Sequence, residues 1–404
     1  MPNPTNRPAD TYSPLYFLAS LGAGGLAVTF FMYLMFWVPH SGKPVPTFED
    51  ISAAFQTGGT PMQAAIIIAV LGIAAMAFLN VKSLIWNLSA FSAFKKTDGY
   101  QKLINSNAES TIMAMPLALA MTVNAMFIVG LVFVPGLWSI IEYLFPLALV
   151  AFALIAVLAF RILAQFLGRI LSQGGIFDVT ANNSFAQMLP AFALSMVAVG
   201  FSAPAAMSGN TTTVGISLVL STFIGTAAIV YALIAIFTAF NSMLHHGTAK
   251  EAGPTLMVVV PIMTVLGIMF LRQNHGLHAT FDIHGSPAET MVFLARLLSI
   301  QIVFLMLGML VLRRQGYFTD FVFGSKTSPG SYALVCPGVA LAVMIHFFVN
   351  KGLVGAGVID KFGPAFWAIT TIALISQFAM IALVLRLNRQ HFGKPASGSA
   401  VPAE

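Results

Sequence analysis

The sequence predicts an all-α integral membrane protein with ten transmembrane helices, arranged as five helical hairpins around a central axis. Of the 404 residues, 58% are apolar and only 8% are charged, and the mean hydropathy is +0.88. Soluble domains carry about 25% charged residues, so this composition excludes a soluble globular protein. The apolar residues fall into ten runs long enough to cross a bilayer, and a repeated proline separates these runs into two kinds.

Roughly 20 apolar residues span the hydrocarbon core of a bilayer. By that measure the expected spans are residues 14–38, 62–90, 110–134, 138–168, 184–208, 212–243, 254–272, 287–312, 331–350 and 363–387. The transmembrane domain therefore covers residues 14–388, between an N-terminal tail of residues 1–13 and a C-terminal tail of residues 389–404. The connectors after the third and fifth spans, Pro135-Gly136 and Ser208-Gly209-Asn210, are very short and predict tight hairpins.

Lysine and arginine residues in the connectors predict the orientation, because cytoplasmic loops carry an excess of them. The side that holds both tails and the loops after the even spans has twelve: Arg7, Lys95, Lys96, Lys102, Arg169, Lys250, Arg313, Arg314, Lys326, Arg386, Arg389 and Lys394. The opposite side has four: Lys43, Arg272, Lys351 and Lys361. An even number of spans also requires both termini to share a side. We therefore expect both termini in the cytoplasm.

Four apolar segments carry a proline in a similar setting. They are Met115-Pro116-Leu117, Leu189-Pro190-Ala191, Val260-Pro261-Ile262 and Cys336-Pro337-Gly338. Successive prolines are 74, 71 and 76 residues apart, which indicates a repeated unit. A proline removes one backbone donor and bends a membrane helix, and this is tolerated where neighbouring helices or a water-filled cavity satisfy the freed carbonyl.

The proline-bearing spans are the third, fifth, seventh and ninth. The first span has Gly22-Ala23-Gly24-Gly25 instead, which loosens the helix and lets helix backbones approach closely. The odd spans thus share a helix-breaking element, and we expect them to line a central pathway with the even spans outside. The predicted pore-lining residues are Gly22, Gly24, Gly25, Met115, Pro116, Leu189, Pro190, Val260, Pro261, Cys336 and Pro337.

Cys336 is the only cysteine and directly precedes the proline of the ninth span. A lone cysteine excludes an intrachain disulfide and a multi-cysteine metal site. At a pore constriction its thiol is a candidate catalytic group that binds or reduces a chalcogen oxyanion or cycles through a sulfenic acid. The alternative is an inert residue packed among helices, as buried free cysteines often are. Met115, Leu189 and Val260 precede their prolines in the same way, so these four residues could also form an apolar collar that resists wetting.

Histidines offer two further candidates. His346 lies ten residues after Cys336, about 15 Å along a helix, which is too far for it to activate the thiol directly. His346 has two interpretations: a ligand or proton relay, or a histidine at the membrane boundary without such a role. His275, His278 and His284 could bind a metal with Asp282, but a solvated loop is the favoured interpretation. We expect no metal and no cofactor.

Several local motifs resemble one known family. They are Gln173-Gly174-Gly175-Ile176-Phe177-Asp178, then Asn183-Ser184-Phe185 and Leu189-Pro190-Ala191, with weaker matches at Asn274-His275-Gly276 and Tyr332–Pro337. This pattern is similar to that of the TehA-like tellurite-resistance and dicarboxylate transporters, which include the plant slow anion channels. The resemblance covers nearly the whole hydrophobic region in order. It implies five helical hairpins around a pore, assembled as a homotrimer, in the bacterial inner membrane.

One position departs from that family. There a phenylalanine on the ninth helix plugs the pore just ahead of the kink, and the matching position here is Cys336. A thiol fills far less space than a phenyl ring and can also do chemistry. This chain looks closer to a bacterial branch of similar length that uses cysteine or selenocysteine.

The leading functional prediction is a membrane pore or transporter for a small anion or oxyanion, along the axis formed by the odd spans. No Asp or Glu lies securely mid-membrane, which is compatible with anion passage and argues against a carboxylate-based proton-coupled cation transporter. The alternative is a membrane-embedded thiol oxidoreductase with Cys336 as the reactive group and an unidentified electron donor. A structural or partner-binding membrane subunit is the third possibility. The net charge of +6 reflects the cytoplasmic anchoring residues and gives no evidence for a nucleic-acid partner.

Overall fold

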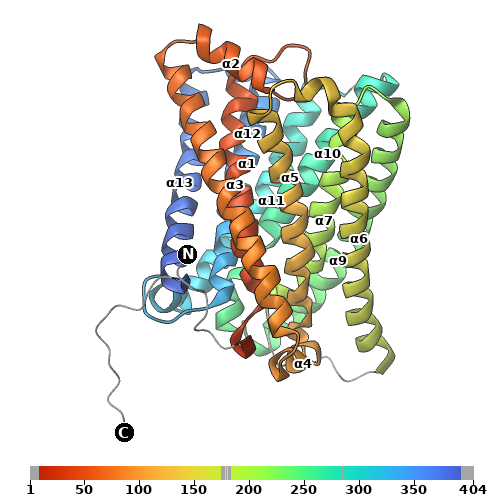
Figure 1. The fold of residues 1–404 in the computed structure, drawn as a ribbon. Coiled ribbons are helices and arrows are strands. Elements are labelled where there is room, and N and C mark those ends of the chain that lie inside the picture. Colours follow the sequence, from red (N-terminus) through yellow and green to blue (C-terminus); the bar gives the residue numbers. More distant parts are fainter. Residues whose placement is uncertain (1–8, 174–177, 179, 181–182, 284, 393–404) are drawn as a thin grey trace.

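The computed structural model describes residues 9–173, 178, 180, 183–283 and 285–392, and this part of the chain is helical without strands (Figure 1). Ten of its helical segments are long and apolar enough to cross a membrane. They cover Pro14–Trp37, Thr60–Phe94, Asn107–Phe133, Leu137–Gln173, Phe185–Met207, Thr211–His246, Lys250–Phe281, Pro287–Arg314, Pro329–Val354 and Pro364–Phe392. The predicted fold class, a ten-span all-α membrane protein, is confirmed.

The spans are built from longer α-helices with short helices at their ends and in the connectors. The long helices are α1 (Phe17–Trp37), α3 (Thr60–Phe94), α5 (Ala114–Phe133), α6 (Ile141–Gln173), α7 (Leu189–Phe201), α9 (Thr211–His246), α10 (Val259–Phe281), α11 (Pro287–Arg314), α12 (Val335–Phe347) and α13 (Pro364–Phe392). The short α-helices are α2 (Phe48–Thr57), α4 (Asp98–Ile104) and α8 (Ala203–Met207). A π-helix, Phe348–Val354, continues α12.

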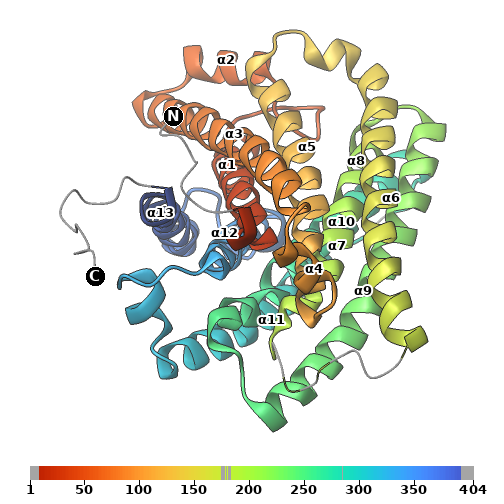
Figure 2. The same cartoon turned by 60° about the horizontal axis from the view of Figure 1, so that its bottom comes forward.

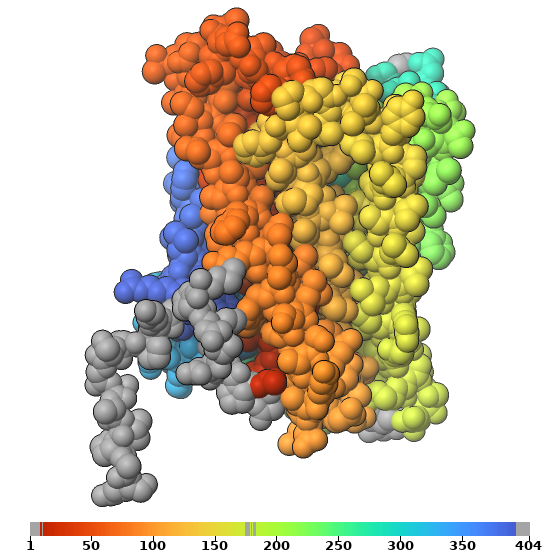
Figure 3. All heavy atoms as spheres, viewed as in Figure 1, coloured from red at the N-terminus to blue at the C-terminus, as the bar shows by residue number. Residues whose placement is uncertain are grey.

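The odd-numbered spans form the interior of the bundle. Between 50% and 94% of the residues in their most apolar stretches are buried, against 17% to 33% in the even-numbered spans. The exposed side chains of the even spans are largely apolar, and Leu71, Val219 and Ile375 are examples. Figure 3 shows two of these outer helices, α3 in orange and α6 in yellow, on the surface of the molecule. Such a surface suits contact with a lipid bilayer.

The five inner helices form a closed ring. In sequence order, α1, α5, α7, α10 and α12 each contact the next, and α12 returns to contact α1 (Figure 2). Each is followed in the chain by its hairpin partner, and the partners α3, α6, α9, α11 and α13 pack on the outside. The sequence therefore folds as five hairpins around one axis.

Glycines allow α1 and α12 to approach closely in this ring. A Cβ atom at Gly22 would lie 2.9 Å from Cγ1 of Val335, and one at Gly25 would lie 2.8 Å from Cγ1 of Val339. Both distances are shorter than ordinary carbon contacts, so only glycine fits without a shift. The glycine cluster of the first span serves close packing.

Buried amide side chains connect outer helices to inner ones. Asn80 of α3 donates through Nδ2 to the carbonyl of Ser20 at 2.8 Å. Gln301 of α11 donates through Nε2 to the carbonyl of Val260 at 2.9 Å and to Oγ1 of Thr264. Because the bilayer core offers no water, the amide N–H groups donate within the protein, and these bonds help to fix the register of the two hairpins.

The sequence suggested that the repeated prolines bend α-helices in the middle of the spans. The structure places them elsewhere. Each odd span begins as a 3₁₀-helix and continues as an α-helix; the 3₁₀ segments are Pro14–Tyr16, Asn107–Met113, Phe185–Met188, Lys250–Met257 and Pro329–Leu334. The repeated prolines, Pro116, Pro190, Pro261 and Pro337, occupy the second or third residue of the α-helix that follows. A missing N–H costs little there, because the first α-helical turn has no intrahelical acceptor for it. The shared irregularity is therefore a change of helix type.

A serine precedes four of the five 3₁₀ segments. Ser13, Ser106, Ser184 and Ser328 each accept a hydrogen bond from the backbone N–H two residues later, at 3.2 to 3.3 Å. Serine side chains compete well for backbone donors at helix starts. This serine is a second mark of the repeat, in addition to the proline.

The two ends of the described chain lie at the same end of the bundle. The Tyr16 hydroxyl and His391 Nδ1 are 3.1 Å apart, and the rings of Tyr16 and Phe392 are 5.9 Å apart. We call this the terminal end, and the opposite end, which carries α2, the distal end. All five inner helices run from the terminal end to the distal end.

Candidate functional site

A cavity of about 850 Å³ lies on the axis inside the ring of inner helices. At the distal end its wall includes the loop residues Pro44, Gly285 and Gly355. Towards the terminal end it stops at a level that includes Phe192 of α7 and Cys336 of α12. These two residues also line a second void of only about 10 Å³ on the terminal side, which has room for a single water molecule. The axial space is therefore wide on the distal side and closed on the terminal side.

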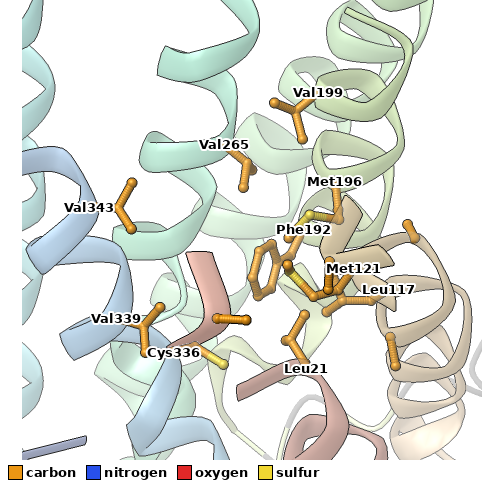
Figure 4. Close-up of a cluster of buried hydrophobic side chains, with 14 of the residues drawn as sticks. Leu21, Leu117, Met121, Phe192, Met196, Val199, Val265, Cys336, Val339 and Val343 are labelled. Atoms are coloured by element: carbon orange, nitrogen blue, oxygen red, sulfur yellow. The ribbon is translucent and has the colours of Figure 1, made fainter. Parts of the chain in front are cut away.

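Apolar side chains form the closed level. Figure 4 shows Phe192 projecting from α7 between α12, which carries Cys336 and Val339, and α5, which carries Met121. Phe192 is 3% exposed and Cys336 is 9% exposed, so both side chains are buried at this level. A constriction lined by such groups resists wetting and can act as a hydrophobic gate.

The sequence-predicted pore residues divide into two groups. Gly22, Gly25, Pro261 and Cys336 line the axial cavity, and Leu189 lines the small void beyond it. The remaining residues, Gly24, Met115, Pro116, Pro190, Val260 and Pro337, do not line the cavity and pack among the helices. The proline repeat does not define which face of each helix is turned to the axis.

Two of these residues show why. A Cβ atom on Gly24 would meet Cγ of Met121 at 2.8 Å and Nδ2 of Asn80 at 2.9 Å, so this glycine faces α3 and α5. Val260 is fully buried in a second apolar cluster that contains Leu312 of α11. Of the four residues predicted to form a collar, only Cys336 lines the axial cavity.

Phe192 is the residue at the constriction that sequence reasoning missed. It lies two residues after Pro190, and the equivalent positions after the other repeated prolines carry Ala118, Met263 and Val339. Phe192 is thus the one aromatic at this position of the repeat. Comparing the residues that follow each proline, rather than those that precede it, would have singled it out.

The distal half of the cavity has basic side chains in its wall. These are Arg272, His275 and His278 of α10 and Lys351 of the π-helix. Neutral polar groups accompany them at Asn124, Asn274 and Asn350. Within the described residues, no Asp or Glu lines the cavity.

Arg272 is held by the end of α7. Its Nη1 donates to the carbonyl of Val199 at 2.8 Å, and this carbonyl also accepts from Oγ of Ser202. The helical hydrogen-bond pattern is interrupted between α7 and α8, and Pro204 lacks an N–H. Backbone carbonyls at the end of α7 are therefore open to side-chain donors. Arg272 forms no ion pair with any carboxylate in the part of the chain that the structure describes.

From the sequence, Arg272 and Lys351 are expected only as loop charges. Arg272 ended the predicted seventh span, but α10 continues through it to Phe281. A basic side chain inside the bundle is costly, and such residues commonly mark a pathway or a ligand site. The basic wall can attract anions and compensate their loss of water.

Cys336 faces the cavity as a buried free thiol. Within the described chain it has no hydrogen-bond or ion-pair partner from another side chain. The ring of His346 faces elsewhere, with its centroid 6.0 Å from that of Tyr33 and 6.3 Å from that of Trp37. Among the described residues no group is therefore in place that could activate the thiol, and redox chemistry at Cys336 stays a prediction.

The loop histidines do not form a metal site in the described part of the chain, where no cluster of three or more metal-binding side chains occurs. His284, one of the four candidate ligands, lies outside the described residues. Gly174, Gly175, Ile176 and Phe177 of the glycine-rich motif also lie outside them.

Comparison of the chain with protein-family models, with curated proteins and with solved structures found no match. The resemblance to the TehA-like family stays a prediction from local motifs. The function must therefore be inferred from the cavity itself.

Proposed function

We propose that this protein moves a small anion across the membrane through the axial cavity. The observation that carries the proposal is the charge of the cavity wall, which has the cations of Arg272 and Lys351 but, among the described residues, no carboxylate. Arg272 forms no ion pair with a carboxylate in the described chain, and such a cation in a low-dielectric wall attracts anions and repels cations. The resemblance to TehA-like transporters and slow anion channels implies the same activity.

The route has two stages. An anion enters from the distal end, where Arg272 and the polar groups replace part of its hydration shell. It then meets the constriction at Phe192 and Cys336, close to the N-terminal ends of all five inner α-helices. Helix N-termini carry a partial positive charge, so they favour an anion at this level. Passage requires Phe192 to move, since the terminal side of the cavity is closed.

The same resemblance implies a homotrimer in a bacterial inner membrane, and the charge count implies cytoplasmic termini. With this orientation the terminal end faces the cytoplasm and the cavity opens towards the periplasm. Each subunit would then have its own pathway, because inner and outer helices of a single chain line the cavity.

Replacing Arg272 with glutamine is expected to lower anion flux about tenfold to hundredfold. A charge pair at about 4 Å in an environment of effective dielectric constant near 20 is worth roughly 4 kcal/mol, and each 1.4 kcal/mol is tenfold. This energy sets the upper limit, and water in the open cavity screens part of it. Initial rates of chloride and nitrate efflux from proteoliposomes measure the effect. Potassium efflux from the same vesicles, with chloride replaced by gluconate, tests selectivity.

Two variants serve as controls for this experiment. Arg272→Lys keeps the charge and is expected to retain most of the flux. Arg296→Gln removes a charge from an exposed position on α11 that does not line the cavity, and should leave the flux unchanged. Undiminished anion flux in Arg272→Gln, or potassium efflux as fast as chloride efflux, would contradict the proposal.

A further inference from the structure

A buried polar site lies between α1, α12 and α13, beside the cavity wall. At its centre is His346, which is 1% exposed. In the described structure neither ring nitrogen of His346 has a hydrogen-bond partner. Its ring packs near those of Tyr33 and Trp37, which are stacked on each other with centroids 4.6 Å apart. A buried imidazole with both nitrogens unpaired is unusual in a native interior.

The helices around His346 carry further polar atoms without partners in the described chain. They are Nε1 of Trp37, Oγ1 of Thr370 and Nε2 of Gln377, each on a side chain at least nine-tenths buried. Tyr33 lies beside three of these side chains, because its hydroxyl donates to Oε1 of Gln377 at 2.7 Å and its ring packs near those of Trp37 and His346. Thr370 and Gln377 are seven residues apart and so lie on one face of α13.

The chemistry of these atoms indicates what the site binds. The indole N–H and the amide NH₂ can only donate, whereas a neutral imidazole offers one donor and one acceptor. Water satisfies such a mixture, and buried water typically makes about three hydrogen bonds to groups of this kind. A water molecule beside an imidazole can also deliver a proton to it.

We propose that Trp37, His346, Thr370 and Gln377 bind buried water, and that His346 takes up a proton from it when an anion occupies the axial cavity. The site would make the protein a proton-coupled anion carrier, and this inference rests on the proposed anion pathway. His346 is one residue from Phe347 and three from Val343, and both of these line the cavity. An anion in the cavity and a proton on His346 are therefore neighbours across a single helix wall.

Among the described residues, no carboxylate lies beside His346 to balance the charge of a protonated imidazole. The titratable side chains on the described elements packed against α12 are Tyr33 (α1), Arg272, His275 and His278 (α10), Glu289, Arg296, Arg313 and Arg314 (α11), Tyr332 (the preceding 3₁₀ segment), Lys351 (the π-helix), and Arg386, Arg389 and His391 (α13). Those of α10 line the cavity, and the one carboxylate in this set, Glu289, is exposed. Only Tyr33 contacts the ring of His346. A bound anion would therefore be the partner of the imidazolium, and by linkage each promotes the binding of the other.

Anion-linked proton uptake tests the inference directly. Purified protein in weakly buffered detergent solution at about pH 6.5, near the ordinary pKa of histidine, is titrated with sodium nitrate while a pH indicator is followed. Calorimetry measures nitrate binding in parallel. We expect about one proton taken up for each nitrate bound in the unmodified protein, and at least a fivefold smaller uptake in His346→Gln.

The matched control is His245→Gln, which removes an exposed histidine at the end of α9 whose Nδ1 lies 2.8 Å from the carbonyl of Asn241. It should keep the full proton uptake. In proteoliposomes His346→Gln should still pass nitrate but lose the stimulation of flux by acid. The number of protons taken up per nitrate bound is measured on the unmodified protein. It therefore tests the proposal even if His346→Gln does not fold.

The outcomes separate this inference from the proposed function. Nitrate binding or flux without proton uptake overturns the inference and leaves the anion pathway standing. Equal proton uptake in His346→Gln and the unmodified protein also overturns it. Neither binding nor flux of nitrate, chloride or tellurite would overturn both proposals together.

Discussion

Replacing Phe192 with alanine is expected to raise anion flux through the reconstituted protein about tenfold or more. The phenyl ring extends from α7 to the level where the axial cavity ends, and only a void of about 10 Å³ lies beyond it. Cys336 on the opposite wall is too small to close the gap by itself. Removing the ring joins the two spaces and shortens the apolar barrier that an anion must cross. Efflux of chloride from proteoliposomes gives the measurement.

Loss of a buried ring also destabilises a protein, so this experiment needs controls. Phe→Ala changes in cores cost about 3–5 kcal/mol of stability. Phe185→Ala removes a fully buried ring from the same span that does not line either space, and it should leave flux low. Phe192→Leu keeps much of the volume and should pass anions only slightly faster than the unmodified protein. Flux in folded Phe192→Ala that stays at the unmodified level would exclude Phe192 as the gate.

Replacing Gly25 with valine is expected to destabilise the protein by about 1–3 kcal/mol and to reduce anion flux about tenfold or more. A Cβ atom at this position would lie 2.8 Å from Cγ1 of Val339, so α1 and α12 would be forced apart. Gly25 also lines the cavity, and a larger side chain would narrow it. Thermal unfolding in detergent and nitrate efflux from vesicles report the two effects.

Gly215 of α9 is the matched control for this change. A Cβ atom there would meet nothing within 4 Å, so Gly215→Val makes the same chemical change, with the same helix propensity cost, at an open position. Its unfolding temperature and flux should stay near those of the unmodified protein. Equal effects of valine at both positions would show that α1 and α12 are not held at contact distance.

The membrane class and the ten spans follow from the sequence, because long apolar runs can satisfy their backbone polar groups only as helices. The inner position of the odd spans also follows, since the repeated prolines and the glycines of the first span occur only there. The α2 helix was missed because it is short and amphipathic. Its start is marked by a capping box between Thr47 and Asp50 rather than by hydropathy.

The site was less accessible to sequence reasoning. The repeat pointed to Pro261 and Cys336, which line the cavity, and to Val260 and Pro337, which do not, because the rotation of each helix is decided by its packing partners. Arg272 appeared to end a span, because hydropathy windows average a polar face with an apolar one. The carbonyl that holds it, on Val199, becomes available through a helix break and a tertiary contact that no local pattern records.

Chemical labelling of Cys336 tests most directly whether the axial cavity admits anions from the distal end. The chain has a single cysteine, so any labelling reports this position alone. The reagents are an anionic sulfonatoethyl methanethiosulfonate and a cationic trimethylammonium analogue, each normalised to its rate with a free thiol. They are added separately from each side of a membrane in which the orientation of the protein is known.

We expect the anionic reagent to modify Cys336 from the distal side at least about tenfold faster than the cationic one, which corresponds to a difference of roughly 1.4 kcal/mol between the two reagents in the cavity. From the terminal side we expect no modification unless Phe192 is replaced by alanine. Faster modification by the cationic reagent, or access only from the terminal side, would contradict an anion pathway through this cavity.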